Sequence, residues 1–158
     1  MRNSGFTLIE LVVTVLIVAI LATGATPIVQ VTIQRNKETE LKQALRQIRE
    51  AIDQYKKAVD EGKIKKTLDQ SGYPPSLEIL EKGVSNQTDL KGALIKFIRK
   101  IPRDPMNDDP DLKPSETWAK RCYASDVDSP MEGADVYDIH SRSSKKAING
   151  SFYSTWSK

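Results

Sequence analysis

The sequence has few of the residues on which most active sites depend. It contains one cysteine, Cys122, and one histidine, His140, among 158 residues. A lone cysteine excludes an intrachain disulfide, and a lone histidine excludes both a histidine metal cluster and a paired general base. We expect Cys122 to be a small buried apolar residue in a strand, and His140 to have a surface or packing role. With no serine–histidine–acid order and no glycine-rich phosphate loop, the sequence predicts no enzymatic activity.

The sequence also lacks a large excess of positive or negative charge. The formal net charge is only +3, and the charged residues are spread along the chain. This balance gives no basic footprint for nucleic acid, so we expect no nucleic-acid partner. The aromatic side chains gather late in the sequence, where we expect them to pack a small core: Trp118, Tyr123, Tyr137, Phe152, Tyr153 and Trp156.

The N-terminal region, in contrast, is rich in apolar residues. After Arg2 an apolar run begins at Phe6, carries one charge at Glu10, and has no other until Arg35. This length is about the 20 residues that a transmembrane helix needs, and Arg2 predicts a cytoplasmic N-terminus. A carboxylate within such a segment is a functional-site hypothesis by default. The alternative is a cleaved signal peptide with its small-residue site at residues 23–25.

The stretch Gly5-Phe6-Thr7-Leu8-Ile9-Glu10 resembles the processing site of the type IV prepilin and pseudopilin family. The resemblance implies that a prepilin peptidase removes leader residues 1–5 after Gly5 and methylates the new N-terminal residue, Phe6. It also implies that Glu10 guides filament assembly, and that residues 6–34 are retained as a membrane and filament-core helix.

Residues 23–27 interrupt the apolar run. Gly24 is a poor helix former, and Pro27 removes a helical hydrogen bond and clashes with the preceding turn. We expect a kink or a local opening of the helix here. A passive kink and a segment that melts during filament packing both fit this pattern.

Residues 35–62 are densely charged, with apolar residues at alternating spacings of four and three. This spacing predicts one apolar face of a helix that ends near Gly62. If the helix is continuous from Phe6, it is about 80 Å long. We expect the apolar face to pack against a globular domain, with a coiled coil as the alternative. The predicted packing residues are Leu41, Leu45, Ile48, Ile52, Tyr55 and Val59.

Residues 63–158 are expected to form that domain. One short helix is predicted from Pro75 or Ser76 to Gly83, and a second from Asp89 to Pro102 with Leu90, Leu94, Phe97, Ile98 and Ile101 on its buried side. Strand candidates are 117–124, 135–141 and 151–156. The fold class is therefore α+β, with a long N-terminal helix packed against short helices and a small antiparallel sheet. The segments 73–77 and 101–105 are similar to elements of the major pseudopilins of type II secretion, which implies a pilin-like fold.

A metal site receives little support. Many major pseudopilins hold calcium in an acidic C-terminal loop, but the corresponding stretch here contains Arg142, Lys145 and Lys146. Calcium prefers several carboxylate oxygens, so we do not carry this site over and expect no cofactor. A different cation site remains open at a second acidic cluster, for which a solvated turn is the main interpretation: Asp104, Asp108, Asp109 and Asp111.

The resemblance implies a function as the major-type pseudopilin of a type II protein secretion system. The protein would wait in the inner membrane as a single-pass protein with its C-terminal domain in the periplasm. It would then form a homopolymer, with minor pseudopilins, an inner-membrane assembly platform and membrane lipid as further partners. One alternative is a type IV pilin of a surface fibre. Another is a membrane-anchored periplasmic binding protein that does not polymerise.

Overall fold

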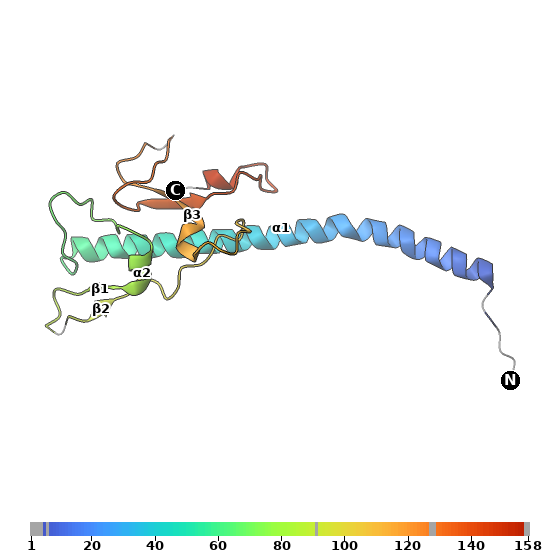
Figure 1. The fold of residues 1–158 in the computed structure, drawn as a ribbon, viewed down its shortest axis with the longest axis horizontal. Coiled ribbons are helices and arrows are strands. Elements are labelled where there is room, and N and C mark those ends of the chain that lie inside the picture. The colour runs from blue at the N-terminus through green and yellow to red at the C-terminus, as the bar shows by residue number, and fades with distance from the viewer. Residues whose placement is uncertain (1–4, 6, 91, 127–128, 157–158) are drawn as a thin grey trace. The chain divides into compact units, whose positions relative to one another are not determined.

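The chain divides into two compact units, Met1–Asn36 and Lys37–Lys158. The structure, a computed structural model, describes residue 5 and residues 7–90, 92–126 and 129–156, with the side chains of residues 23–28 left out. Helix α1, Leu8–Asp60, supplies most of the first unit and the central helix of the second (Figure 1). Around it in the second unit lie short helices and two small antiparallel sheets. The predicted α+β fold class is thereby confirmed, and the arrangement is consistent with a pilin-like fold.

The end of α1 follows from local backbone chemistry. Gly62 has a φ of 71°, a conformation that glycine adopts without steric cost. The amides of Gly62 and Lys63 donate to the carbonyls of Val59 and Ala58, so the last turn is closed by the chain itself. The helix therefore ends where glycine allows the chain to turn.

The core of the second unit forms along one face of α1. The six side chains predicted to pack there all lie in the hydrophobic core cluster, together with Ala44, Ala51 and Ala58. The alanines fall between the larger residues and let other segments approach the helix closely. The opposing side chains come from the whole length of the domain, namely Ile64, Leu77, Leu80, Ile98, Ile101, Met106, Trp118, Val136, Ile139, Ala147 and Tyr153.

The first predicted short helix is present, but it begins later than Pro75. Helix α2 spans Glu78–Lys82, and Leu77 and Leu80 are fully buried on either side of its start. Gly83, with a φ of 89°, follows its last residue. Its Cβ position would lie 2.9 Å from the carbonyl oxygen of Ile95, so only glycine fits this crossing.

The second predicted helix, from Asp89 to Pro102, is wrong. The chain instead forms strand β1, Val84–Ser85, which pairs antiparallel with β2, Leu94–Ile95. Leu90 and Leu94 are exposed rather than buried, whereas Ile98 and Ile101 reach the core. The amides of Phe97 and Ile98 both donate to the carbonyl of Leu80, which holds this segment extended across α2. Tertiary hydrogen bonds thus override the helical spacing of the apolar residues.

Two of the three predicted strands are present in shorter form. Strand β3, Trp118–Arg121, pairs antiparallel with β4, Asp138–Ser141, in the register Trp118↔Ser141. A short 3₁₀ helix, η1, Pro114–Glu116, precedes β3. In the view of Figure 1, β3 and β4 are drawn on one side of α1 and β1 and β2 on the other.

The third predicted strand, 151–156, is wrong. One isolated bridge joins Phe152 to Lys146, and Tyr153–Thr155 then forms the 3₁₀ helix η2. The buried ring of Tyr153 explains the change. Its hydroxyl donates to Glu38 Oε1 at 2.9 Å, which pulls the chain in toward α1 instead of along the edge of β4.

Candidate functional site

The start of α1 is held by a reciprocal pair of side chains. The Thr7 hydroxyl accepts a hydrogen bond from the amide of Glu10 at 3.3 Å. Glu10 Oε2 in turn accepts hydrogen bonds from the Thr7 amide at 3.4 Å and from the Thr7 hydroxyl at 3.2 Å. This is a capping box, which satisfies backbone donors that have no partner inside the helix. The carboxylate of Glu10 also lies at the positive end of the helix dipole. In the single chain, Glu10 therefore stabilises its own helix terminus.

The sequence contained the signal for this cap. Threonine followed three residues later by glutamate, ahead of an apolar run, is the sequence pattern of a capping box. Sequence reasoning treated Glu10 only as an assembly residue and missed Thr7. The predicted cleavage and methylation site extends to Phe6, which lies outside the described residues.

The side chains that follow this cap are apolar and exposed. Fourteen described Leu, Ile and Val residues between Leu8 and Ile33 are more than 40% exposed in the single chain. They are Leu8, Ile9, Leu11, Val12, Val13, Val15, Leu16, Ile17, Val18, Ile20, Leu21, Val29, Val31 and Ile33, and we call them the exposed apolar segment. Such a surface marks a site of interaction with protein or lipid.

Two further observations concern this region. Within the part of the chain that the structure describes, no helix is both long and apolar enough to span a membrane. The predicted kink at Gly24 and Pro27 falls in residues 23–28, outside those whose side chains are described.

A comparison with known protein families gives a match in this same N-terminal region. The chain carries a prokaryotic N-terminal methylation motif. The match covers residues 1–26 and therefore includes Gly5, Phe6, Glu10 and Gly24. This methylation motif is typical of type IV pilin-like proteins, which are processed by a prepilin peptidase, remain membrane-anchored and polymerise into filaments. It is typical of structural proteins rather than enzymes. Neither the curated proteins nor the solved structures gave a match to the chain.

Within the second unit, Arg49 joins α1 to the C-terminal segments. Its Nε donates to Asp138 Oδ1 at 2.7 Å, and its Nη2 donates to the carbonyls of Ile139 and Trp156 at 3.0 and 2.7 Å. Asp138 is buried, so this ion pair stands largely outside water and depends on both partners. Sequence reasoning gave Arg49 no role because the pattern of α1 shows only that it borders the apolar face.

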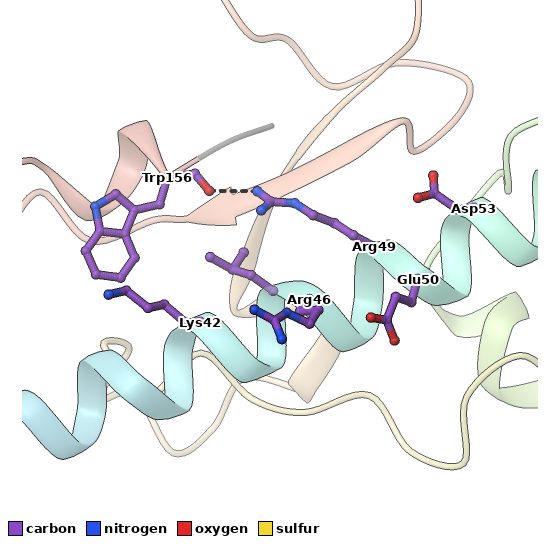
Figure 2. A pocket seen from close by; sticks show the side chains of 7 residues that line it. Lys42, Arg46, Arg49, Glu50, Asp53 and Trp156 are labelled. Carbon is purple, nitrogen blue, oxygen red and sulfur yellow. Dashed lines mark hydrogen bonds between the residues drawn. The ribbon is translucent and has the colours of Figure 1, made fainter.

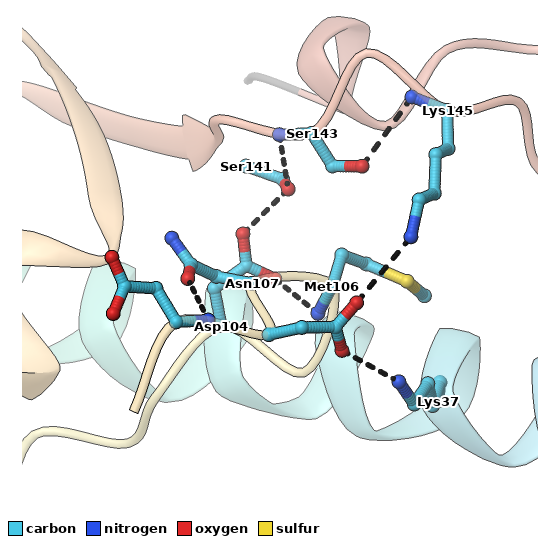
Figure 3. A network of polar contacts seen from close by, with 9 residues as sticks. Lys37, Asp104, Met106, Asn107, Ser141, Ser143 and Lys145 are labelled. Atoms are coloured by element: carbon cyan, nitrogen blue, oxygen red, sulfur yellow. Dashed lines mark hydrogen bonds and ion pairs between the residues drawn. The ribbon is translucent and has the colours of Figure 1, made fainter. Parts of the chain in front are cut away.

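The acidic cluster considered for a cation is divided between two environments (Figure 3). Asp104 is 1% exposed, so a solvated turn is the wrong description for it. Its Oδ1 accepts the amide of Met106 at 2.8 Å, and its Oδ2 accepts the Ser141 hydroxyl at 2.5 Å. Asp108 is exposed and accepts Lys37 Nζ at 3.2 Å and Lys145 Nζ at 3.4 Å. These two ammonium groups hold the pKa of Asp108 below its ordinary value.

The four carboxylates therefore do not converge. Among the described residues, no group of three or more His, Cys, Asp and Glu side chains could hold a metal ion. Lys145, whose charge argued against a calcium loop, lies against Asp108 and ties the segment after β4 to the loop that follows Asp104. The Asp108 carboxylate is thus already paired with two cations of the protein itself.

The other residues considered for catalysis, His140, Cys122 and Ser141, are packed against or bonded to other parts of the domain. His140 lies within β4 opposite Ala119, and burial lowers the pKa of its imidazole below 6.5 despite the nearby Asp138. Cys122 follows β3 rather than lying in it, and it is only partly buried. Ser141 is bound to Asp104, and the amide of Ser143 donates to the Ser141 hydroxyl at 3.1 Å. These contacts give Ser141 a structural role.

Proposed function

We propose that this protein is the major-type pseudopilin of a type II secretion system, a filament subunit that polymerises through its N-terminal helix. The observation that carries the proposal is the methylation motif over residues 1–26, followed by the exposed apolar segment of α1. The motif supplies the processing signal, and the segment supplies a surface that a single chain leaves uncovered.

The exposed apolar segment supports two successive environments for the same helix. Fully burying one Leu, Ile or Val side chain contributes about 1.5–3 kcal/mol. A bilayer can provide this burial before assembly, and neighbouring copies can provide it in a filament. Exchange between the two is then nearly balanced in apolar burial, so the polar groups near Glu10 can decide the direction and register of packing.

Glu10 is proposed to act twice. In the single chain it caps α1 through Thr7. In the filament it would pair with the methylated amine of Phe6 on a neighbouring copy, since two charges neutralised together avoid the cost of one left unpaired in an apolar setting. In the proposed division, residues 1–5 are the leader, 6–34 the membrane and filament-core helix, 35–62 the amphipathic helix, and 63–158 the periplasmic domain.

The choice of pseudopilin over pilin rests on sequence features. The single cysteine excludes the intrachain disulfide that commonly closes the C-terminal loop of type IV pilins in Gram-negative bacteria. The proposed location is the inner membrane with a periplasmic domain, and the proposed partners are a prepilin peptidase, minor pseudopilins and an assembly platform. A surface pilin is the second candidate function, favoured by the same motif.

Intact-mass measurement and membrane cross-linking test the proposal together. The mature chain should lack Met1–Gly5 and carry one additional methyl group, and Gly5→Val should block this processing because a branched side chain replaces the smallest residue. Cross-linking in membranes should give a ladder of oligomers. A mature chain beginning after Ala25, or monomers only, would contradict the proposal. Ladders recovered in material sheared from the cell surface would favour the surface pilin.

A further inference from the structure

The segment between β4 and η2 closes on itself, and we call its residues 145–152 the C-terminal turn. An isolated bridge joins Lys146 to Phe152, and the Ala147 amide donates to the Ser151 carbonyl at 2.8 Å. Ala147 itself is buried in the core of the second unit. The turn is therefore held in place from its inner side.

Glu38 of α1 binds this turn a second time. Its Oε1 accepts hydrogen bonds from the Ile148 amide at 2.8 Å and from the Tyr153 hydroxyl at 2.9 Å. In the sequence of α1, Glu38 follows Ile33, the last member of the exposed apolar segment, by five residues. The C-terminal turn is thus fixed at the end of the second unit where α1 enters it.

The outward side chains of the turn are apolar residues and lysines. Ile148 and Phe152 are 45% and 44% exposed. The Nζ of Lys146 lies 5.2 Å from the centroid of the Phe152 ring, and Lys145 is exposed next to it in the chain.

The same pairing of a lysine with an aromatic ring recurs beyond η2. Figure 2 shows Lys42 beside the Trp156 ring, with its Nζ 5.0 Å from the ring centroid. The indole Nε1 donates to the Ser151 hydroxyl at 2.8 Å, which fixes this ring to the C-terminal turn. We call the six side chains the C-terminal patch: Lys42, Lys145, Lys146, Ile148, Phe152 and Trp156.

This mixture of side chains is typical of a surface that meets the membrane–water interface. Tryptophan rings lie at the level of the lipid headgroups there, and lysines are attracted to anionic lipids. Two carboxylates bond to the turn, Glu38 and Asp108, and Asp108 is also paired with Lys37. The lysines of the patch and Lys37 outnumber these carboxylates, so the charge of the patch suits an anionic partner.

We propose that the C-terminal patch docks on the anionic phospholipid headgroups of the bilayer that holds the exposed apolar segment. The inference rests on the proposed function, because it requires that segment to lie in the bilayer before assembly. A headgroup layer is about 5–7 Å thick on each side of the hydrocarbon core. Four or five helical residues rise by about the same distance. A layer that begins where the segment ends therefore reaches Glu38 and the turn bound to it.

Lipid quenching in the full-length chain tests the contact. A Cys122→Ser, Ile148→Cys chain carries an environment-sensitive fluorophore in vesicles of phosphatidylcholine and phosphatidylglycerol in equal parts. A lipid with a spin label on its headgroup should quench the fluorophore, and this quenching should be lost in vesicles of phosphatidylcholine alone. The matched control is Leu68→Cys, a fully exposed apolar position in the loop after Gly62, which should stay unquenched in both.

Neutral substitutions test the role of the lysines. Lys145→Gln with Lys146→Gln should abolish the quenching at Ile148, whereas arginine at both positions should keep it. Lys65→Gln with Lys66→Gln removes the same charge from the loop after α1 and should leave the quenching unchanged. Exposed ion pairs contribute little stability, so the loss of Lys145 should not unfold the domain.

The outcomes separate this contact from the proposed function. An unquenched Ile148 label on a chain that floats with the vesicles would overturn the docking and leave the membrane anchor intact. A label that is shielded from water but not quenched by lipid would show that protein covers the patch, and would also overturn it. Equal quenching at Ile148 and Leu68 would attribute the signal to the fluorophore and overturn it as well. A chain that does not float with the vesicles would contradict both proposals.

Discussion

The two parts of α1 differ in whether the rest of the chain covers their apolar side chains. The fourteen side chains of the exposed apolar segment lie uncovered, whereas Leu41, Ile48 and Ile52 of the same helix are fully buried. In the second part the polypeptide folds back on the helix and covers one face. In the first part, no described segment of the chain covers the apolar side chains, and an exposed apolar surface of this size is typical of a site of interaction with protein or lipid.

The difference teaches how a single helix can be both a core element and an interface. A stripe of apolar residues with polar residues between them specifies one buried face. An apolar surface on all sides specifies burial by an environment instead of by a domain. Substitutions in the first part should therefore alter assembly, and those in the second part should alter folding.

The largest effect is expected at Glu10. Glu10→Ala should be cleaved and inserted normally, yet its filament yield should fall about tenfold or more, since an unpaired charge in an apolar setting costs several kcal/mol. Glu10→Asp should be partly tolerated. Sedimentation of cross-linked membranes measures the yield.

Glu10→Gln separates the two roles of this residue. Glutamine keeps the capping hydrogen bonds to Thr7 and removes the charge. If pairing with an amine matters, Glu10→Gln should fail like Glu10→Ala, while Thr7→Ala, which removes only the capping hydroxyl, should assemble. Wild-type yield from Glu10→Gln would show that the cap alone explains the residue.

A matched pair of isoleucines compares the two parts of α1 directly. Ile48→Ala should lower the free energy of unfolding of the domain by about 2–5 kcal/mol, because it leaves a cavity in the core. Ile17→Ala should leave domain stability unchanged and reduce polymer yield. Denaturant unfolding in detergent, followed through the buried Trp118, measures the first quantity. Equal destabilisation by both variants would contradict the division into two roles.

Asp104 should matter more than its acidic neighbours. Asp104→Ala leaves the Ser141 hydroxyl and the Met106 amide without their acceptor, which should cost about 1–3 kcal/mol of stability. Asp111→Ala is the matched control, since Asp111 is exposed, and it should change stability by about 0.5 kcal/mol or less. Denaturant unfolding measures both losses of stability. Similar losses from the two variants would contradict a buried, hydrogen-bonded role for Asp104.

Calcium should have little effect on the domain. Asp108 is already bound by Lys37 and Lys145, and Asp104 is directed into the protein. A ligand that binds only the folded state raises stability with its concentration, so equal melting temperatures in calcium and in chelator are expected. A rise of several degrees at millimolar calcium would show that the acidic loop binds the ion.

The smallest effect concerns His140. Its pKa is lowered by burial, so the unfolded chain binds this proton more readily than the folded chain does. Stability should be fully present above about pH 6.5 and should fall slightly as the pH drops toward the lowered pKa. His140→Asn should flatten this slope on the acid side of about pH 6.5. An unchanged slope in the variant would assign it to other groups.

The sequence by itself determined the features that depend on neighbouring residues. The spacing of Leu41, Leu45 and Ile48 defines a helical face, and Gly62 supplies the turn that ends it. The Thr7–Glu10 cap is equally local, and it could have been read from the sequence. The α+β class follows from these patterns and from the β-branched and aromatic residues around β3 and β4.

Only the tertiary structure decided the elements whose hydrogen bonds come from far along the chain. Residues 94–98 have apolar spacing that suits a helix, but the carbonyl of Leu80 and the strand at Val84 hold them extended. Tyr153 leaves the expected strand because its hydroxyl reaches Glu38. Asp104 is buried because Ser141, 37 residues away, donates to it. Local pattern sets what a segment can form, and distant partners with unsatisfied donors and acceptors select among the possibilities.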